Sequence, residues 1–577
     1  MAVRPYDEQA ASISGFDPAM AEFLIARIDS ALSRASRDLR PARAAWAMDS
    51  VWKRTRIRSL EAYDRNDPKF TSRWTPPPGL TRNESLIDPT WTMLRVDQLD
   101  PTSGRYRPAG AFSIFAIHGT GNSNGNALFD GDIHALMERG LEAHIDSLRG
   151  VERGFAPASI HLVAQGAEGD VSPNFTPETR CPVARLRRLR RPSGPRSPPA
   201  PEGYVDASPD EMGTCLRKGR ELVSQLGDEL SGRAIAIFDG LSPTLARESS
   251  GQVRIARVFE VVDMVGVGEG DTPCPVPRNG TASAVGGEDG YTRLLHWKLL
   301  GFIPMGFEQG GSAVDRKSRD CHRPKRVLLG KAQTIVAGKY GLPRVAQLTV
   351  MRIGGMIIGT VPAEVTTTAA SRMRDAMVRG ARRTGAHPDS VVLLGLTNGY
   401  MHYVTTPEEY QLQHYEGAST IHGPSSSVAL ADALERLAAL LPAVGGPSPT
   451  AQVPALTAHP GGRKRILPSR DTGPALVRRA VTAVWKRDTL VVRWLDQYPG
   501  RLVPADGPVL AIQVRAGTGW RTVAWDDDRD LEVRALKAAG RRGFHWEAKW
   551  SGPREAGASY RVVLLRRGEL EEISASP

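Results

Sequence analysis

The chain has 577 residues, more than one ordinary hydrophobic core can organise, so two or more domains are expected. With 41% hydrophobic and 24% charged residues it has the composition of a globular protein, and no apolar run reaches the roughly 18 residues of a membrane-spanning helix. No RNA- or DNA-binding motif accompanies the net charge of +12, so no nucleic-acid partner is expected.

Much of the positive charge lies in one stretch. Residues 185–191 contain five arginines and precede a Pro/Ser-rich tract through Pro201, a pattern typical of an exposed insertion loop. A basic surface fits anionic lipid headgroups at least as well as it fits nucleic acid.

Four cysteines are widely spaced: Cys181, Cys215, Cys274 and Cys321. Because none forms a Cys-X-X-Cys pair, a cysteine zinc knuckle is excluded. One or two disulfides would suit an oxidising compartment, and the sequence does not decide between them. The N-terminus shows no apolar region of a signal peptide.

The first part of the chain alternates helices and strands. The predicted elements are an amphipathic helix over 16–39, a strand over 111–117, a helix over 131–148 and a strand over 160–165. The first strand ends at His118, and the second leads into a Gly-Asp turn that presents Ser172 before Pro173. Reactive residues that follow strands predict an α/β core with its site at the strand ends.

The Ser172 turn is stiff because the proline biases the serine toward extended backbone on a loop. Taken alone, such a turn is typical of an ordinary surface loop. A lone histidine such as His118 is more often not a ligand, and the basic stretch around Arg58 is typical of a solvated loop.

The next predicted elements are a β-hairpin over 347–352 and 356–361, a helix ending at Val378, a strand over 391–396 and a helix over 427–441. Glu364 lies between the hairpin and the helix. Taken by itself, a glutamate at this place is typical of a charge that the dipole favours at the start of a helix. Thr406, Pro407 and Glu409 form a capping box, and the helix that begins there is predicted to carry Tyr410 and Tyr415.

A Gly/Pro-rich basic linker is predicted over residues 447–474. Short alternating strands with turn signals follow, beginning at residues 480–485 and ending at residues 560–565. They predict a β-sandwich of roughly 100 residues.

These motifs together resemble the neutral/alkaline ceramidases, which are zinc amidases that hydrolyse N-acyl sphingoid bases. The resemblance rests on residues 116–118, the Ser172 turn, residues 361–364 and, most specifically, the tyrosine-rich block 398–425. It implies an α/β (α+β) catalytic domain with a mixed sheet over residues 1–446, the linker, and an immunoglobulin-like domain over residues 475–577.

The resemblance also assigns roles to residues. It implies three zinc ligands: His118, Glu364 and Tyr403. It makes Ser172 the nucleophile or the group that positions the attacked carbonyl, and the choice stays open. Tyr415 becomes a hydrogen-bond donor near the developing oxyanion, and Arg58 lines the site.

The resemblance further implies a second divalent cation, Mg²⁺ or Ca²⁺, at Asp526 and Asp528 in the C-terminal domain. Leu531 stands where the family has a threonine ligand. An acidic loop is by itself usually only solvated.

One departure concerns the family's first zinc ligand, which lies in a His-X-His motif. The twelve histidines here are all at least eight residues apart, so the motif does not occur. In the family it lies just upstream of a segment like residues 6–18. The chain therefore resembles a family member that starts after that motif, either because the true start lies upstream or because the protein is naturally truncated. A real truncation would lower activity by orders of magnitude.

The expected function is zinc-dependent hydrolysis of the N-acyl amide bond of ceramide to sphingosine and a fatty acid at a peripheral membrane surface, outside the cytoplasm or in the cell envelope. The alternatives are an amidase of the same fold that acts on another N-acyl lipid, and a catalytically impaired lipid-binding homologue.

Overall fold

The computed structural model describes residues 18–67, 74–122, 126, 128–151, 159–173, 209–247, 253, 255–264, 273–284, 286–287, 298–299, 303–304, 321–328, 333, 342–385, 390–441, 479–496, 510–539, 543–566 and 569–573. The arginine-rich run at 185–191 and the linker predicted over 447–474 lie outside these ranges.

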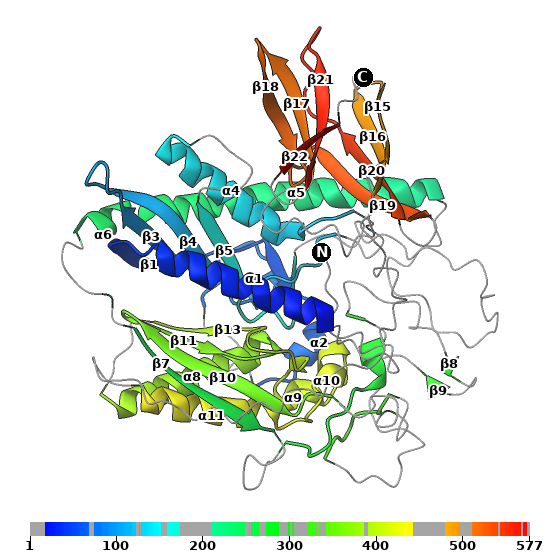
Figure 1. Cartoon of the computed structure of the whole chain (residues 1–577). Helices are drawn as coiled ribbons and strands as arrows, with labels where there is room; N and C mark the ends of the chain where they lie inside the picture. Colours follow the sequence, from blue (N-terminus) through cyan, green and yellow to red (C-terminus); the bar gives the residue numbers. More distant parts are fainter. Residues whose placement is uncertain are drawn as a thin grey trace.

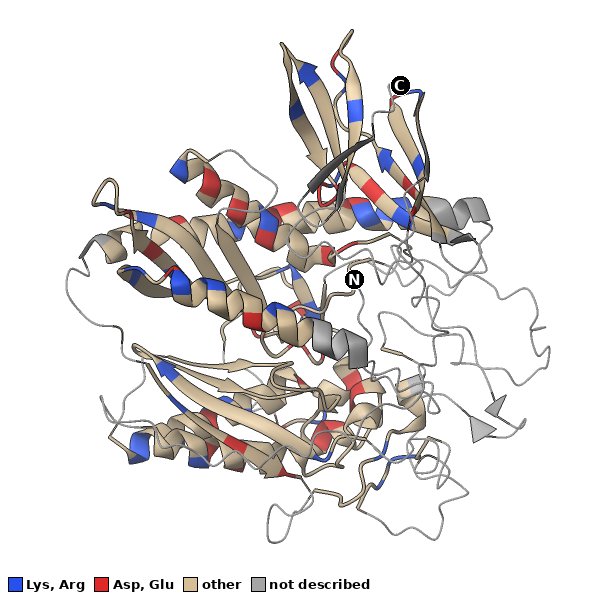
Figure 2. Ribbon diagram, viewed as in Figure 1, with Lys and Arg blue, Asp and Glu red and all other residues tan. Residues whose placement is uncertain are grey.

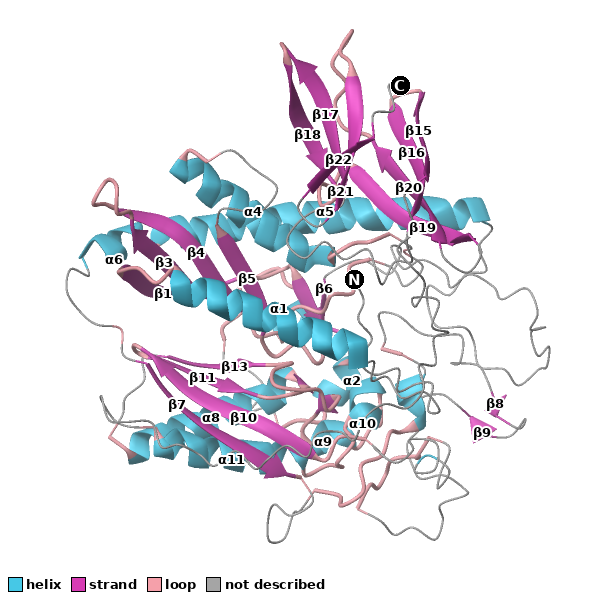
Figure 3. Cartoon of the chain, in the orientation of Figure 1, coloured by secondary structure: helices cyan, strands magenta, loops and turns pink. Residues whose placement is uncertain are grey.

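Two four-stranded mixed sheets lie at the centre of the first domain (Figures 1 and 3). The first contains, in spatial order, β1 (Ala42–Ser50), β3 (Thr90–Leu99), β4 (Tyr106–Phe115) and β5 (Ile160–Gln165). The second contains β13 (Ser390–Leu394), β11 (Met356–Thr360), β10 (Val345–Ile353) and β7 (Ile255–Asp263). All neighbouring pairs are antiparallel except β4–β5 and β11–β13, which are parallel. The mixed sheet predicted from the sequence is therefore present.

Helices cover the outer faces of both sheets. Helices α4 (Asp132–Arg149) and α5 (Pro209–Gly240) pack on the first sheet, and α8 (Thr367–Arg383) and α11 (Ser426–Leu440) pack on the second. The inner faces meet through an apolar cluster of Ile114, Met356, Ile358 and Val392. The layers therefore follow the order helix, sheet, sheet, helix. Each sheet forms a separate apolar core with the helices on its outer face. Of the helices that the structure describes, none has the length and hydropathy of a membrane span.

Local sequence signals predict the regular elements well. Strand β5 has the predicted bounds, α4 is displaced by one residue, and the β10–β11 hairpin turns at Gly354 with a positive φ of 61°. The amphipathic helix α1 (Pro18–Arg37) is also present, although Ile25, Ile28 and Leu32 on it are exposed.

Short elements complete the described part of the first domain. They are β2 (Thr55–Ile57), β6 (Val171–Pro173), β12 (Glu364–Val365), β14 (Tyr403–Val404), α2 (Leu60–Tyr63), α3 (Arg82–Ser85), α6 (Ser242–Arg247), α9 (Pro407–Tyr410), α10 (Tyr415–Ser419), η3 (Thr281–Ala284), β8 (Lys298–Leu299) and β9 (Ile303–Pro304).

Two predictions about these elements are wrong. Ser172 lies in the strand β6 rather than on a loop, because the extended backbone that Pro173 imposes lets the segment pair with β2. Tyr415 does not share a helix with Tyr410, since the helix that Thr406 caps ends after one turn and Tyr415 begins α10.

The C-terminal domain consists of two four-stranded sheets around one core. The first sheet contains, in spatial order, β15 (Arg479–Lys486), β16 (Thr489–Asp496), β20 (Gly543–Trp550) and β19 (Leu531–Ala539). The second contains β18 (Gly519–Trp525), β17 (Leu510–Ala516), β21 (Tyr560–Arg566) and β22 (Glu569–Ile573). All pairs are antiparallel. This is the predicted two-sheet arrangement, and its immunoglobulin-like character stays a prediction.

Glycine permits a close contact between the helices α8 and α11. An added Cβ at Gly380 of α8 would lie 2.1 Å from the Glu435 backbone oxygen on α11, whereas at Gly232 of α5 it would meet no atom within 4 Å. We expect Gly380→Ala to lower the free energy of unfolding by about 1–3 kcal/mol through overpacking. Gly232→Ala should raise it by about 0.5–1 kcal/mol, since alanine is the better helix former. Urea unfolding of both variants checks this, and equal effects would contradict the close α8–α11 contact.

Candidate functional site

Three of the predicted site residues meet at strand ends. His118 follows β4, and the parallel pairing of β12 with β14 places Glu364 opposite Tyr403. His118 Nε2 lies 2.8 Å from Glu364 Oε2 and 3.1 Å from the Tyr403 hydroxyl. The three side chains predicted to be zinc ligands thus converge from segments up to 285 residues apart.

The His118 ring is oriented by one carbonyl. The backbone N–H of His118 donates to the Val171 oxygen at 3.0 Å, and Nδ1 lies 3.2 Å from the same oxygen. Because a carbonyl only accepts, Nδ1 carries the proton of this contact and Nε2 faces Glu364 and Tyr403. Metal-binding histidines commonly have this arrangement, in which the second ring nitrogen is held by a backbone carbonyl.

Glu364 is held ionised by its neighbours. Burial opposes its ionisation, but hydrogen bonds involving His118, Tyr400 and Tyr403 outweigh burial and lower the pKa of Glu364 to about 2. The Tyr400 hydroxyl donates to Glu364 Oε1 at 2.6 Å. The sequence reading did not single out Tyr400 as a site residue, and its only signal was its place in the tyrosine-rich block.

Arg58 lies inside the site, as the resemblance implied. Its Nε donates to Glu416 Oε1 at 2.7 Å, and its Nη2 donates to the Gly169 carbonyl at 2.9 Å and lies 3.2 Å from the Tyr403 hydroxyl. The guanidinium carbon lies 5.6 Å from the centre of the Tyr415 ring, which packs edge-on against Tyr403. Sequence reasoning missed Glu416, the carboxylate that fixes Arg58.

Both phenols of the site keep their protons in the absence of a cation. Burial, and then the negative charge of Glu364, raise the pKa of Tyr415 to about 12 and that of Tyr403 well above its ordinary value. Tyr415 is therefore available as a hydrogen-bond donor. Tyr403 would lose its proton only to a strong local positive charge such as a metal ion.

Ser172 is buried at 1% exposure and stands opposite Arg56 in the β2–β6 pair. It directly follows Val171, whose carbonyl orients His118. The preceding Asp170 fastens this segment to the start of α8, because its Oδ1 accepts hydrogen bonds from the backbone and hydroxyl of Thr367, both at 2.8 Å.

The loop between β13 and β14 is strained. Leu396, Asn398 and His402 have positive φ values of 53°, 60° and 63°, which non-glycine residues seldom adopt. The loop carries Tyr400 and ends at Tyr403. Strained backbone of this kind concentrates at functional sites, where the surrounding structure holds it.

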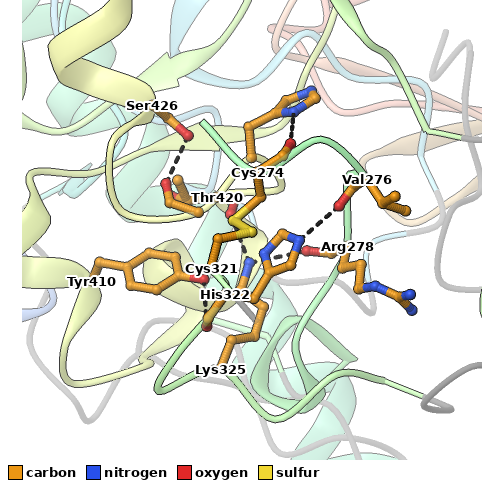
Figure 4. The surroundings of a disulfide bond; sticks show 11 residues. Cys274, Val276, Arg278, Cys321, His322, Lys325, Tyr410, Thr420 and Ser426 are labelled. Atoms are coloured by element: carbon orange, nitrogen blue, oxygen red, sulfur yellow. Dashed lines mark hydrogen bonds between the residues drawn. A yellow bond between two sulfur atoms is a disulfide. The ribbon is translucent and has the colours of Figure 1, made fainter. Parts of the chain in front are cut away.

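Helix α10, which begins with Tyr415, is braced by a disulfide-linked segment (Figure 4). Cys274 and Cys321 form the disulfide, and Lys325 Nζ donates to the Thr420 carbonyl at the end of α10 at 2.6 Å. Within the described residues, only Cys274, Cys321 and His322 form a group of three or more His, Cys, Asp or Glu with metal-ligand spacing. Because both sulfurs are oxidised, the group offers no thiolate to a metal.

Glu168 provides a test of whether the site suits a cation. It is 1% exposed, and neither carboxylate oxygen has a hydrogen-bond partner. Burial, and then the charge of Glu364, raise the pKa of Glu168 well above its ordinary value. The buried guanidinium of Arg58 is already paired with Glu416, so Glu168 keeps its proton in the metal-free site, and a bound cation would favour its ionised form.

An imidazole nitrogen, an ionised carboxylate and a phenol that converge in this way suit a divalent cation of borderline hardness. The residues present therefore fit zinc, and His118, Glu364 and Tyr403 are the ones that would hold it.

The acidic loop predicted to bind a second cation lies far along the chain, in the C-terminal domain. Asp528 Oδ2 accepts the Trp525 N–H at 2.7 Å. Asp527 pairs with Arg139 of α4 at 3.1 Å, so the loop docks on the first domain. Binding of Mg²⁺ or Ca²⁺ at Asp526 and Asp528 stays a prediction.

The sequence profile described as "Neutral/alkaline non-lysosomal ceramidase, N-terminal" matches residues 6–190 and 304–432, more than half of the chain. The chain belongs to this family. The neutral ceramidase of Mycobacterium tuberculosis is 27% identical over 98% of this chain and 81% of that protein. The neutral ceramidase of Drosophila melanogaster is 28% identical over 74% of this chain, which spans only 58% of the fly protein. The predicted membership of an amide-hydrolase family is thereby confirmed.

Solved ceramidases share the fold. A structure titled "Ceramidase complexed with C2" aligns with a TM-score of 0.62 and 21% identity over 94% of this chain and 78% of that one. The neutral ceramidase from Pseudomonas aeruginosa aligns with a TM-score of 0.60 and 22% identity over 95% of this chain and 78% of that one. The mixed α/β architecture predicted from the sequence is that of these ceramidases.

Replacing Glu168 should affect the metal-free and metal-bound protein in opposite directions. A raised pKa means that its contribution to stability is present below the unfolded pKa and is lost as pH rises through the folded pKa. We expect Glu168→Leu to raise the free energy of unfolding of the metal-free protein at pH 8 by about 1–3 kcal/mol, with a smaller gain at pH 5. The variant should bind zinc about 10-fold more weakly, since a carboxylate that the cation would ionise is gone.

Urea unfolding with chelator and zinc titration measure the two effects. Glu61→Leu, at a carboxylate whose side chain is 79% exposed, is the control. A loss of metal-free stability at both pH values would show that the Glu168 carboxylate is partnered after all.

Proposed function

We propose that the chain is a zinc-dependent amidohydrolase that cleaves the N-acyl amide bond of ceramide to sphingosine and a free fatty acid. The observation that carries the proposal is the convergence of His118, Glu364 and Tyr403, with the His118 ring fixed by the Val171 carbonyl. Family membership supplies the substrate class, since the relatives described above are named neutral ceramidases.

His118, Glu364 and Tyr403 would hold Zn²⁺, which when bound polarises an amide carbonyl as a Lewis acid. The buried phenol of Tyr415 keeps its proton and can donate it in a hydrogen bond to the oxygen on which charge develops. Arg58 holds Glu416 and the Gly169 carbonyl and thereby fixes the wall of the site.

Ser172 would attack the carbonyl or position it. It is buried, and the carbonyl of Val171, directly before it on the same strand, orients His118, so Ser172 is tied through one residue to the proposed metal ligand. Burial also excludes water from its surroundings, which strengthens electrostatic interactions there.

A peripheral membrane surface is the proposed place of action. Helix α1 exposes Leu24, Ile25, Ile28 and Leu32, and basic residues lie along the same helix (Figure 2). An exposed amphipathic helix with arginines suits the interface of a bilayer. The disulfide between Cys274 and Cys321 supports the proposed location outside the cytoplasm, because such bonds persist in oxidising compartments.

The test is hydrolysis of a fluorescent N-acyl sphingosine with and without chelator. We expect chelator-sensitive turnover, a loss of at least about 100-fold in kcat for Ser172→Ala, and a loss of about 10²-fold for Tyr415→Phe, as for removal of an oxyanion donor. Ser147→Ala on the exposed face of α4 and Tyr106→Phe on β4 are matched controls that should keep full activity.

The alternative functions give different results. Turnover confined to another N-acyl lipid in a substrate panel would identify an amidase of different specificity. A folded chain that neither binds zinc nor turns over any N-acyl lipid would indicate a lipid-binding homologue.

A further inference from the structure

The side chain of Gln165 extends the β4–β5 pair beyond the point at which its backbone pairing ends. The register of these strands stops at Phe115 opposite Gln165. Beyond it, Gln165 Oε1 accepts the Ile117 N–H at 3.3 Å, and Gln165 Nε2 donates to the Ile117 carbonyl at 2.7 Å. One amide side chain therefore satisfies both backbone groups of the residue directly before His118.

His134 on α4 holds this amide in place. Its Nε2 lies 3.0 Å from Gln165 Nε2. Because an amide nitrogen only donates, His134 Nε2 accepts this bond and the ring is the neutral tautomer protonated on Nδ1. Burial, and then the neighbouring His118, lower the pKa of His134 to about 4, which agrees with a neutral ring.

Both protons of the Gln165 amide are thus used, one on Ile117 and one on His134. If the Gln165 amide were flipped, its oxygen would face the Ile117 carbonyl oxygen and the lone pair of His134, and these acceptors would repel it. The contacts therefore allow only the orientation described. His118 is consequently anchored from two sides, through Ile117 by Gln165 and through its own N–H and Nδ1 by Val171.

We propose that Gln165 and His134 are positioning residues for His118, which set the place of its Nε2 and so the affinity and geometry of the metal site. The inference rests on the proposed zinc site but not on the identity of the substrate. Outer groups that orient a metal ligand typically contribute about 10–100-fold to metal affinity.

The experiment measures metal binding on the full chain without substrate. Zn²⁺ affinity is obtained by competition with a chromophoric chelator, and ligand geometry from the absorption spectrum of the Co²⁺-loaded protein. We expect Gln165→Leu and His134→Leu to bind Zn²⁺ about 10–100-fold more weakly and to alter the Co²⁺ spectrum. His134→Gln, which keeps an acceptor, should recover most of the affinity.

His144→Leu is the matched control, since His144 lies on the same helix and faces the exposed Asp239. The double variant of Gln165 and His134 should lose little more than either single variant, because the two act in one chain of contacts. Urea unfolding of each metal-free variant verifies that it is folded, and His134→Gln keeps the test valid if a leucine variant does not fold.

Unchanged Zn²⁺ affinity and Co²⁺ spectrum in folded variants would overturn the proposal, as would an equal loss in His144→Leu. A wild-type chain that binds no zinc would overturn both this proposal and the proposed function. Zinc binding that responds to these variants without ceramide turnover would leave the positioning role standing and remove only the proposed substrate.

Discussion

One carbonyl oxygen, that of Val171, connects the parts of the site. It accepts the His118 backbone N–H and lies against the His118 ring, so it joins the loop after β4 to the strand that carries Ser172. Asp170 ties the same strand to the start of α8, and Arg58 reaches the Gly169 carbonyl beside it. The arrangement of the two sheets matters to the site because it brings these strand ends together.

The electrostatic balance of the site follows from burial. Carboxylates that are removed from water need partners, and here each finds a different solution. Glu416 pairs with the Arg58 guanidinium, Asp170 accepts two bonds from Thr367, and Glu364 is surrounded by hydrogen-bond donors. Glu168 has no such partner. Its pKa is therefore raised, and the proposed zinc would favour its ionised form, which would couple metal binding to protonation of the site.

Local signals in the sequence predicted those parts of the structure that depend on local physics. The capping box at Thr406 and Glu409 forms as expected, because its two hydrogen bonds join residues three apart. Ser172 was predicted on a loop, because nothing local reveals that β6 finds β2 as a partner. Glu416 was missed because it meets Arg58 across 358 residues, and only the fold brings the two together. His118, Glu364 and Tyr403 were found through the family resemblance, since no spacing pattern in one sequence joins residues so far apart.

The acidic turn of the C-terminal domain contacts the first domain directly. Asp527 pairs with Arg139 on α4. The same helix carries His134, which contacts Gln165. The helix that carries His134 is therefore also part of the contact with the C-terminal sheets. Further ion pairs, Arg220 with Glu532 and Arg529 with Asp228, join the same two parts, so exchanging the C-terminal sheets for those of a relative would remove charged partners from α5 as well as from α4.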